Sequence, residues 1–272
     1  MRIALGLEYD GAAFTGWQTQ RDGRGVQDAL ERALASVAGA PVATICAGRT
    51  DTGVHAIDQV VHFETSAVRP LNAWVRGGNR FLPPAASVRW AAEVPDVFHA
   101  RFSAVRRTYE YWILNDPVRS PLAHARTGWV FRPLDATAMH DAAARLVGRH
   151  DFTSFRSAEC QAASPVRDLH DLSVERRGRL IRVRASANAF LHHMIRNIVG
   201  TLVYVGLGRR PPEWVIEVLE ARHRAQAAPT FSAAGLYLVG VEYDPSFLLP
   251  VPAAPVPVWL DAYSNQDLRT HA

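Results

Sequence analysis

The order of apolar patterns in the first hundred residues is the strongest constraint on what this chain can fold into. Period-two alternation predicts strands, and apolar residues spaced three to four apart predict amphipathic helices. The helical spacing is clearest at Val26, Leu30, Ala33, Leu34 and Val37. The patterns follow in the order strand, helix, strand, strand, helix, strand, at residues 3–9, 26–37, 41–47, 59–64, 71–81 and 88–94. This order predicts a split βαβ unit of the ferredoxin-like type.

The second half of the chain repeats this order of elements, although no repeat of residues is visible. Strand patterns cover residues 106–114, 166–174, 180–187 and 236–241, and helical patterns cover 135–147 and 194–205. We therefore expect an α+β protein with two ferredoxin-like (RRM-like) α/β subdomains, whose antiparallel sheets join around a central cleft. The expected boundaries are residues 1–104, residues 105–247 and a proline-rich C-terminal tail at 248–272.

The composition of the chain limits its chemistry. The 272 residues are 48% hydrophobic, which is ample for a buried core. All 30 cationic residues are arginine, so Schiff-base catalysis by lysine and a phosphate-binding loop with lysine are both excluded. Biased genomic composition is the simpler explanation for the missing lysine. The arginines nevertheless suit bidentate contacts with RNA phosphates and stacking on bases.

Several other classes of protein are not expected. The two cysteines, Cys46 and Cys160, provide neither a disulfide framework nor paired zinc spacing. His192 and His193 are adjacent, and adjacent residues of a helix do not share a face, so we expect no metal site. The first residues lack the layout of a signal peptide, and no apolar run could span a membrane. These features predict a cytoplasmic protein with no membrane partner.

The candidate catalytic residue lies between two strand patterns, in residues 45–56. Asp51 is the single carboxylate there, and Gly48 and Gly53 bracket it. Arg49 lies two positions away and leaves an extended chain on the same face, where its guanidinium would keep the carboxylate ionised. Asp and Gly are also common turn residues, so a plain turn is the alternative interpretation.

Three further residues invite functional interpretation, each with packing as the alternative. Tyr109 lies in a strand pattern, where a tyrosine usually packs. Arg196 is a cation in an otherwise apolar helical pattern, a costly position unless an acid pairs with it. Leu236 opens the last strand pattern, where an apolar side chain usually belongs to the core.

Residues 48–56, GRTDTGVHA, closely resemble the signature of the tRNA pseudouridine synthase A family (TruA family, bacterial type). The resemblance implies that Asp51 is the catalytic nucleophile. Thr52 departs from the family pattern, which usually has alanine there, and this could alter the packing of the loop. The segment from Asp151 to Arg156 also matches the family, but no role is evident beyond lining the cleft.

The resemblance assigns roles to the other candidate residues. It implies that Tyr109 stacks on the target base and takes part in a later proton transfer, that Arg196 pairs with Asp51, and that Leu236 contacts the base. We expect Arg49 to fill the space that the flipped uridine leaves.

The function implied is isomerisation of uridine to pseudouridine at positions 38, 39 and 40 in the anticodon stem-loop of tRNA, by a homodimer, without cofactor or metal. Two alternatives remain. A non-catalytic RNA-binding protein could use the same fold, although such a protein gains nothing from an acid that faces phosphates. A nucleoside-cleaving hydrolase could break the same bond, although such enzymes generally use two carboxylates.

Overall fold

The computed structural model describes residues 1–250, so most of the expected C-terminal tail lies outside the described residues. Contacts within the chain divide it into two units, the first formed by residues 1–107 with 237–250 and the second by residues 108–236. Both units are of mixed α/β type. No helix in residues 1–250 combines the length and the apolar character needed to cross a membrane.

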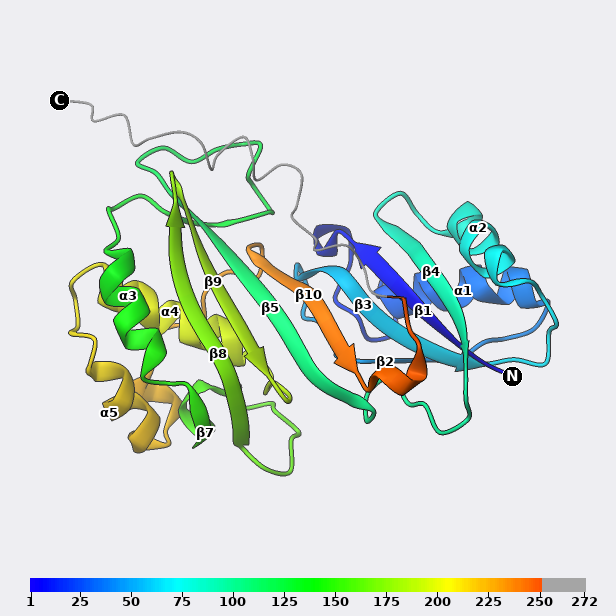
Figure 1. Ribbon diagram of the computed structural model, residues 1–272. Coiled ribbons are helices and arrows are strands. Elements are labelled where there is room, and N and C mark those ends of the chain that lie inside the picture. The colour runs from blue at the N-terminus through cyan, green and yellow to red at the C-terminus, as the bar shows by residue number, and fades with distance from the viewer. Residues whose placement is uncertain (251–272) are drawn as a thin grey trace. The chain divides into compact units, whose positions relative to one another are not determined.

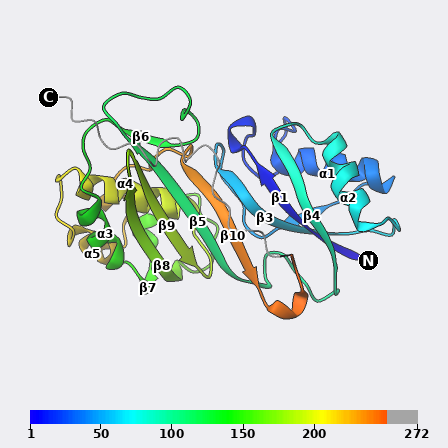
Figure 2. The same cartoon turned by 45° about the horizontal axis from the view of Figure 1, so that its top comes forward.

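The first unit is a sheet with two helices on one face (Figures 1 and 2). β1 pairs antiparallel with both β3 and β4, and β2 pairs antiparallel with β3, which gives the order β4-β1-β3-β2. β10 runs parallel to the start of β3. The elements are β1 (Arg2–Tyr9), α1 (Val26–Ala38), β2 (Thr44–Cys46), β3 (His55–Glu64), α2 (Leu71–Phe81), β4 (Ala86–Val94) and β10 (Leu236–Tyr243).

Both faces of this sheet are covered. On the helical face, Phe63 of β3 meets Trp74 of α2 edge-to-face, with ring centroids 5.1 Å apart. On the other face, Ala4 and Val60 belong to a cluster that includes Phe98, against which Tyr243 packs. β3 is therefore buried along nearly its whole length, and the loop that precedes it is built on a rigid support.

The second unit combines β-strands with three helices (Figures 1 and 2). Its strand order is β5-β9-β8-β7, with β6 parallel to the end of β5. β8 pairs antiparallel with both β7 and β9. The elements are β5 (Ala104–Asn115, whose first residues belong to the first unit), β6 (Gly128–Val130), α3 (Ala136–Ala144), β7 (Gly148–Asp151), β8 (Val166–Arg177), β9 (Leu180–Ala187), α4 (Met194–Gly206) and α5 (Trp214–Ala221).

Most of the predicted elements are present, in the predicted order. Asp135 caps α3 as expected, since its side chain accepts a hydrogen bond from the N–H of Ala138 at 3.0 Å. The strands expected at 166–174 and 180–187 form a hairpin, and Gly178 at its tip has a φ of 57°. The short strands β6 and β7 and the helix α5 were not predicted.

The structure differs from the expectation in two respects. β10 contacts the first unit from residue 237 onward, whereas the sequence analysis placed it in a second subdomain at 105–247. The sheets are also not purely antiparallel, because β3 pairs with β10 and β5 pairs with β6 in parallel. Parallel pairing needs a long connection between the strands, and both pairs have one.

Candidate active site

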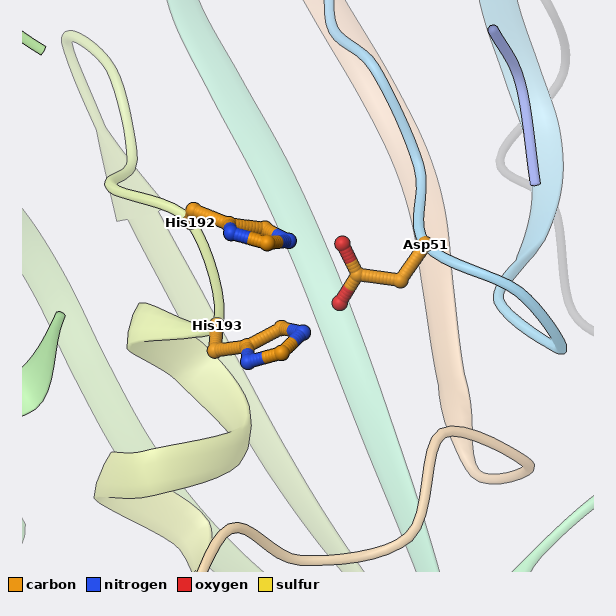
Figure 3. A group of neighbouring side chains, drawn as sticks. All are labelled: Asp51, His192 and His193. Carbon is orange, nitrogen blue, oxygen red and sulfur yellow. The ribbon is translucent and has the colours of Figure 1, made fainter. Parts of the chain in front are cut away.

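Asp51 lies in the loop at residues 47–54 that joins β2 to β3 in the first unit, as predicted (Figure 3). The carbonyl oxygen of Asp51 accepts a hydrogen bond from the N–H of Val54 at 3.1 Å. Gly53 closes this turn with a φ of 79°, a conformation that side chains other than glycine rarely adopt. Asp51 is partly buried, whereas Arg49 and Thr52 are exposed. Thr52, where the family pattern usually has alanine, therefore lies on the surface of the loop.

The segment at residues 10–17 packs directly against the Asp51 loop. The N–H of Trp17 donates to the carbonyl of Thr50 at 2.9 Å. A Cβ atom on Gly11 would lie 2.0 Å from the carbonyl oxygen of Val54, so the close approach requires glycine. Phe14 and Trp17 are buried and pack against Tyr9. They belong to the core.

His55 fixes the other end of the loop. Its ring is buried and stacks on Tyr237, with centroids 4.6 Å apart and an interplanar angle of 18°. Nδ1 accepts a hydrogen bond from the N–H of Gly11 at 3.1 Å. The same Nδ1 lies 3.1 Å from Oδ1 of Asp10, the residue that precedes Gly11. His55 thus ties β3 and β10 to the segment that covers the loop.

Arg107 is a loop-supporting residue that the sequence analysis missed. Its guanidinium is buried and donates to the carbonyl of Ala47 at 3.1 Å, to that of Ala104 at 2.9 Å and to that of Arg101. Arginine can satisfy several carbonyls at once because it carries five N–H donors. A strand pattern by itself does not distinguish such a residue from a surface arginine.

Cys46 lies at the end of β2, immediately before the loop. Burial raises the pKa of its thiol to about 12, although Arg49 and Arg101 act in the opposite direction. The thiolate is the reactive form of cysteine. Cys46 is therefore a neutral core residue, and Asp51 remains the candidate nucleophile of this loop.

In the second unit, Tyr109 lies on β5 and is buried. Its ring meets Phe190 edge-to-face, with centroids 5.2 Å apart. Tyr111, two residues on, is fully buried and donates its hydroxyl to the carbonyl of Ser232 at 2.8 Å. Burial raises the pKa of Tyr111 far above its usual range, so it acts as a structural hydrogen-bond donor.

His192 and His193 precede α4 instead of lying within it. His193 is the N-cap residue and has a left-handed backbone, with a φ of 62°. The two rings lie 4.0 Å apart at 37° (Figure 3). The prediction that the two adjacent histidine rings diverge is therefore wrong, because neither residue lies in a helical turn. A left-handed cap turns the chain and brings the two rings together.

Arg196 lies in the first turn of α4 and is partly buried. Its Nε donates to the carbonyl of Phe231 at 2.9 Å, and the N–H of Phe231 donates to the carbonyl of Arg196 at 3.2 Å. These two bonds hold Arg196 against Phe231. The predicted ion pair between Arg196 and Asp51 stays a prediction, because these residues belong to different units.

Leu236 is the first residue of β10 and is buried, with an exposed fraction of 6%. Its N–H donates to the carbonyl of Ala233 at 3.0 Å. This environment fits the packing interpretation of Leu236. Of the candidate residues, Asp51 and Arg49 lie in the first unit, and Tyr109, Arg196 and Leu236 lie in the second.

The segment from Asp151 to Arg156, for which no role beyond lining the cleft was predicted, anchors α4. Asn197 of α4 donates its amide to the carbonyl of Phe155 at 2.7 Å, and Ser154 accepts from the N–H of His223 at 2.8 Å. Asp151 accepts from the N–H and the hydroxyl of Thr153 at 2.9 and 2.6 Å. Although burial acts to raise the pKa of Asp151, these hydrogen bonds lower it.

Comparison with known proteins decides the family. A sequence profile described as tRNA pseudouridine synthase matches residues 7–103 and 142–244, and the first match includes the Asp51 loop. The chain belongs to the tRNA pseudouridine synthase family. The matched ranges also include Arg196 and Leu236, whereas Tyr109 lies between them.

Full-length relatives give the same result. The tRNA pseudouridine synthase A of Burkholderia multivorans is 54% identical over 267 residues, which cover 98% of this chain and 99% of that protein. The protein of the same name from Burkholderia mallei (strain SAVP1) is 54% identical over 270 residues, 99% of this chain and all of that protein. The one from Herminiimonas arsenicoxydans is 56% identical over 253 residues, 92% of each chain.

Proposed function

We propose that this chain is a tRNA pseudouridine synthase that isomerises uridine at positions 38, 39 and 40 of the anticodon stem-loop, with Asp51 as the nucleophile. Similarity over nearly the whole chain to proteins named tRNA pseudouridine synthase A carries this proposal. The reaction breaks the bond between N1 and the ribose C1′ and joins C1′ to C5; C5 loses a proton and N1 gains one. Substrate and product are isomers, so the proposed reaction uses no cofactor.

The environment of Asp51 suits a nucleophilic carboxylate. The residue is partly buried, and hydrogen bonds from several neighbouring residues fix the backbone of its loop. A fixed nucleophile avoids the entropy loss of being oriented during the reaction. We assign Arg49 to the space left by the flipped uridine, Arg196 to the stabilisation of ionised Asp51, and Tyr109 and Leu236 to contacts with the target base. The family resemblance supports these roles.

The proposed fold is a pair of ferredoxin-like subdomains, with the catalytic loop in a cleft. The order β4-β1-β3-β2 of the first unit, in which α1 and α2 are the connecting helices, supports this proposal. In the second unit, β5, α3, β8, β9 and α4 follow in the same order along the chain.

Release of tritium from C5 tests the reaction and the nucleophile together. A tRNA transcript labelled with tritium at C5 of uridine is incubated with the wild type and, separately, with Asp51→Ala. Rejoining through C5 must expel the label, whereas binding or glycosidic hydrolysis need not. We expect release by the wild type and a loss of at least about a thousandfold in Asp51→Ala, since the nucleophile has no substitute.

The other outcomes distinguish the alternatives. Release by both proteins would keep the reaction but remove Asp51 from its role. Bound tRNA without release by either protein would favour a non-catalytic RNA-binding protein. Free uracil among the products would favour a hydrolase.

The proposed enzyme acts as a homodimer on tRNA. One surface feature supports association: Val118, Leu122, Trp129 and Phe131 are exposed large apolar residues close together in the sequence of the second unit. Concentrations of exposed apolar residues often mark interfaces. The expected cytoplasmic location stays a prediction.

A further inference from the structure

Gln59 lies directly beneath the Asp51 loop. It occupies the middle of β3, and its side chain is fully buried. Nε2 donates to the carbonyl of Gly48 at 2.7 Å, and Oε1 accepts from the N–H of Gly48 at 3.4 Å. A single carboxamide thus pairs with both backbone groups of the glycine that opens the catalytic signature.

Tyr9 extends this contact to the residue next to Asp51. Its side chain is buried on β1, and its hydroxyl lies 2.8 Å from Oγ1 of Thr50 and 3.4 Å from Nε2 of Gln59. A continuous chain of hydrogen bonds therefore runs from Gly48 through Gln59 and Tyr9 to Thr50. All four residues belong to the first unit.

The burial of this network explains why it can act on the loop. Buried polar groups that lose a partner cannot replace it with water. A shift of the loop at Gly48 or Thr50 would therefore break a hydrogen bond and leave its donor and acceptor unpaired. β1 and β3 are neighbouring strands of the sheet and hold Tyr9 and Gln59 in place. The network transmits the rigidity of the sheet to the backbone on the N-terminal side of Asp51.

We propose that Gln59 and Tyr9 are positioning residues, which hold the Asp51 loop in its reactive conformation without touching the substrate. The proposal rests on the proposed function, because it concerns the placement of the nucleophile. It predicts a specific defect: turnover falls, while the affinity for tRNA and the fold are kept.

Gln59→Glu is the sharpest test. This change keeps the shape of the side chain but replaces the donor to the Gly48 carbonyl by an oxygen, which repels that carbonyl when ionised. We expect kcat for tritium release at pH 8 to fall by about tenfold to a hundredfold, the range for a slightly misplaced catalytic group, with KM for tRNA nearly unchanged. At lower pH the introduced carboxyl gains a proton and can donate again. The ratio of the variant's kcat to that of the wild type should therefore rise as pH falls.

Asn79→Asp is the matched control. Asn79 forms the same kind of two-bond pair with a backbone, donating to the carbonyl of Val88 at 2.9 Å and accepting from its N–H at 2.7 Å. It joins α2 to β4, which lies on the opposite side of β1 from β3, the strand that carries Gln59. The control should lose some thermal stability but keep kcat at every pH.

The outcomes separate the two proposals. No release by the wild type overturns the proposed function and, with it, the positioning role. If the wild type releases tritium normally, two results overturn the positioning role alone. One is an unchanged kcat in Gln59→Glu. The other is a loss of kcat whose ratio to the wild type stays the same at every pH.

A second pair of variants applies if Gln59→Glu does not fold. Tyr9→Phe and Thr50→Val each delete one partner of the same hydrogen bond, so the double variant should lose little more kcat than the worse single variant. Independent, multiplicative losses in kcat would overturn the role of Tyr9.

Discussion

Asp58 and His62 lie four residues apart on the same face of β3, and burial disfavours the charged form of each. Burial raises the pKa of Asp58 to about 6, although a hydrogen bond from the N–H of Val241 opposes the shift. Burial lowers the pKa of His62 to about 4, with further contributions from His99 and Arg2. The neutral His62 accepts a hydrogen bond from the N–H of Ala100 at 3.1 Å through Nδ1. Both residues are therefore uncharged in part of the acidic range where their unfolded forms are charged.

The raised pKa of Asp58 predicts a pH-dependent stability difference. Folded Asp58 binds its proton more tightly than the unfolded residue, so the resulting stability is fully present below pH 3.8 and is lost as pH rises through about 6. Asp58→Asn removes this titration but keeps an acceptor for Val241. We expect the free energy of unfolding of the wild type, relative to this variant, to fall by roughly 2–3 kcal/mol between pH 4 and pH 7.

Urea unfolding at several pH values measures this difference. His62 contributes with the opposite sign, since its stability is present above pH 6.5 and lost as pH falls through about 4. This contribution is common to both proteins and cancels in the comparison. A stability difference that stays constant with pH would contradict the shift at Asp58.

At the scale of elements, α4 is held by a buried amide. Asn197 is fully buried. Its side-chain oxygen Oδ1 accepts hydrogen bonds from Nη2 of Arg224 at 3.0 Å and from Oγ1 of Thr230 at 2.6 Å. Its side-chain Nδ2 donates to the carbonyl of Phe155. Three separate segments thus converge on one side chain. Burial lowers the pKa of Arg224, which nevertheless keeps these polar partners.

Asn197→Leu should destabilise the second unit, although the two side chains are similar in size. The change leaves the buried Phe155 carbonyl without this partner, and a buried unpaired group costs about 1–3 kcal/mol. Arg224 and the exposed Thr230 also lose an acceptor, but they keep each other as partners at 3.0 Å. We expect a loss of roughly 1–3 kcal/mol in the free energy of unfolding, measured with urea. Thr230→Val, which removes one of the bonds, should lose less than half of that. Equal losses in the two variants would show that Asn197 does not coordinate the three segments.

The elements differ in how far the sequence could predict them. α1 could be predicted because its apolar spacing is regular and Asp28 accepts from the N–H of Gly25 at 2.9 Å to cap its start. Asp51 could be identified because the signature around it is contiguous. Asn197 and Gln59 could not, because their partners lie 42 and 11 residues away and a buried amide carries no local pattern.

At the scale of the whole molecule, the placement of β10 could not be predicted from local patterns. The sequence of β10 predicts a strand, but its parallel pairing of Tyr237 with His55 joins residues that are distant in the chain. The His55–Tyr237 ring stack accompanies this pairing and reflects tertiary packing. The last strand therefore helps to support the loop that carries Asp51.

The exposed apolar segment of the second unit allows the proposed homodimer to be tested at a defined surface. Leu122 and Phe131 are 79% and 58% exposed. If this surface is buried between two copies, serine at either position loses about 1.5–3 kcal/mol of apolar burial, which corresponds to a rise of roughly tenfold to a hundredfold in the dimer dissociation constant. Trp129 is a less suitable target, because its Nε1 donates to the carbonyl of Asp116 at 2.8 Å.

Sedimentation velocity over a range of concentrations measures the effect on Leu122→Ser and Phe131→Ser. Val68→Ser is the matched control, since Val68 is 78% exposed but lies in the first unit. We expect the wild type and the control to sediment as dimers at concentrations where the two variants dissociate. A monomeric wild type would contradict the homodimer, whereas unchanged dimers in both variants would place the interface elsewhere. Dissociated variants that also lose tritium release, while still folded, would show that the dimer is the active form.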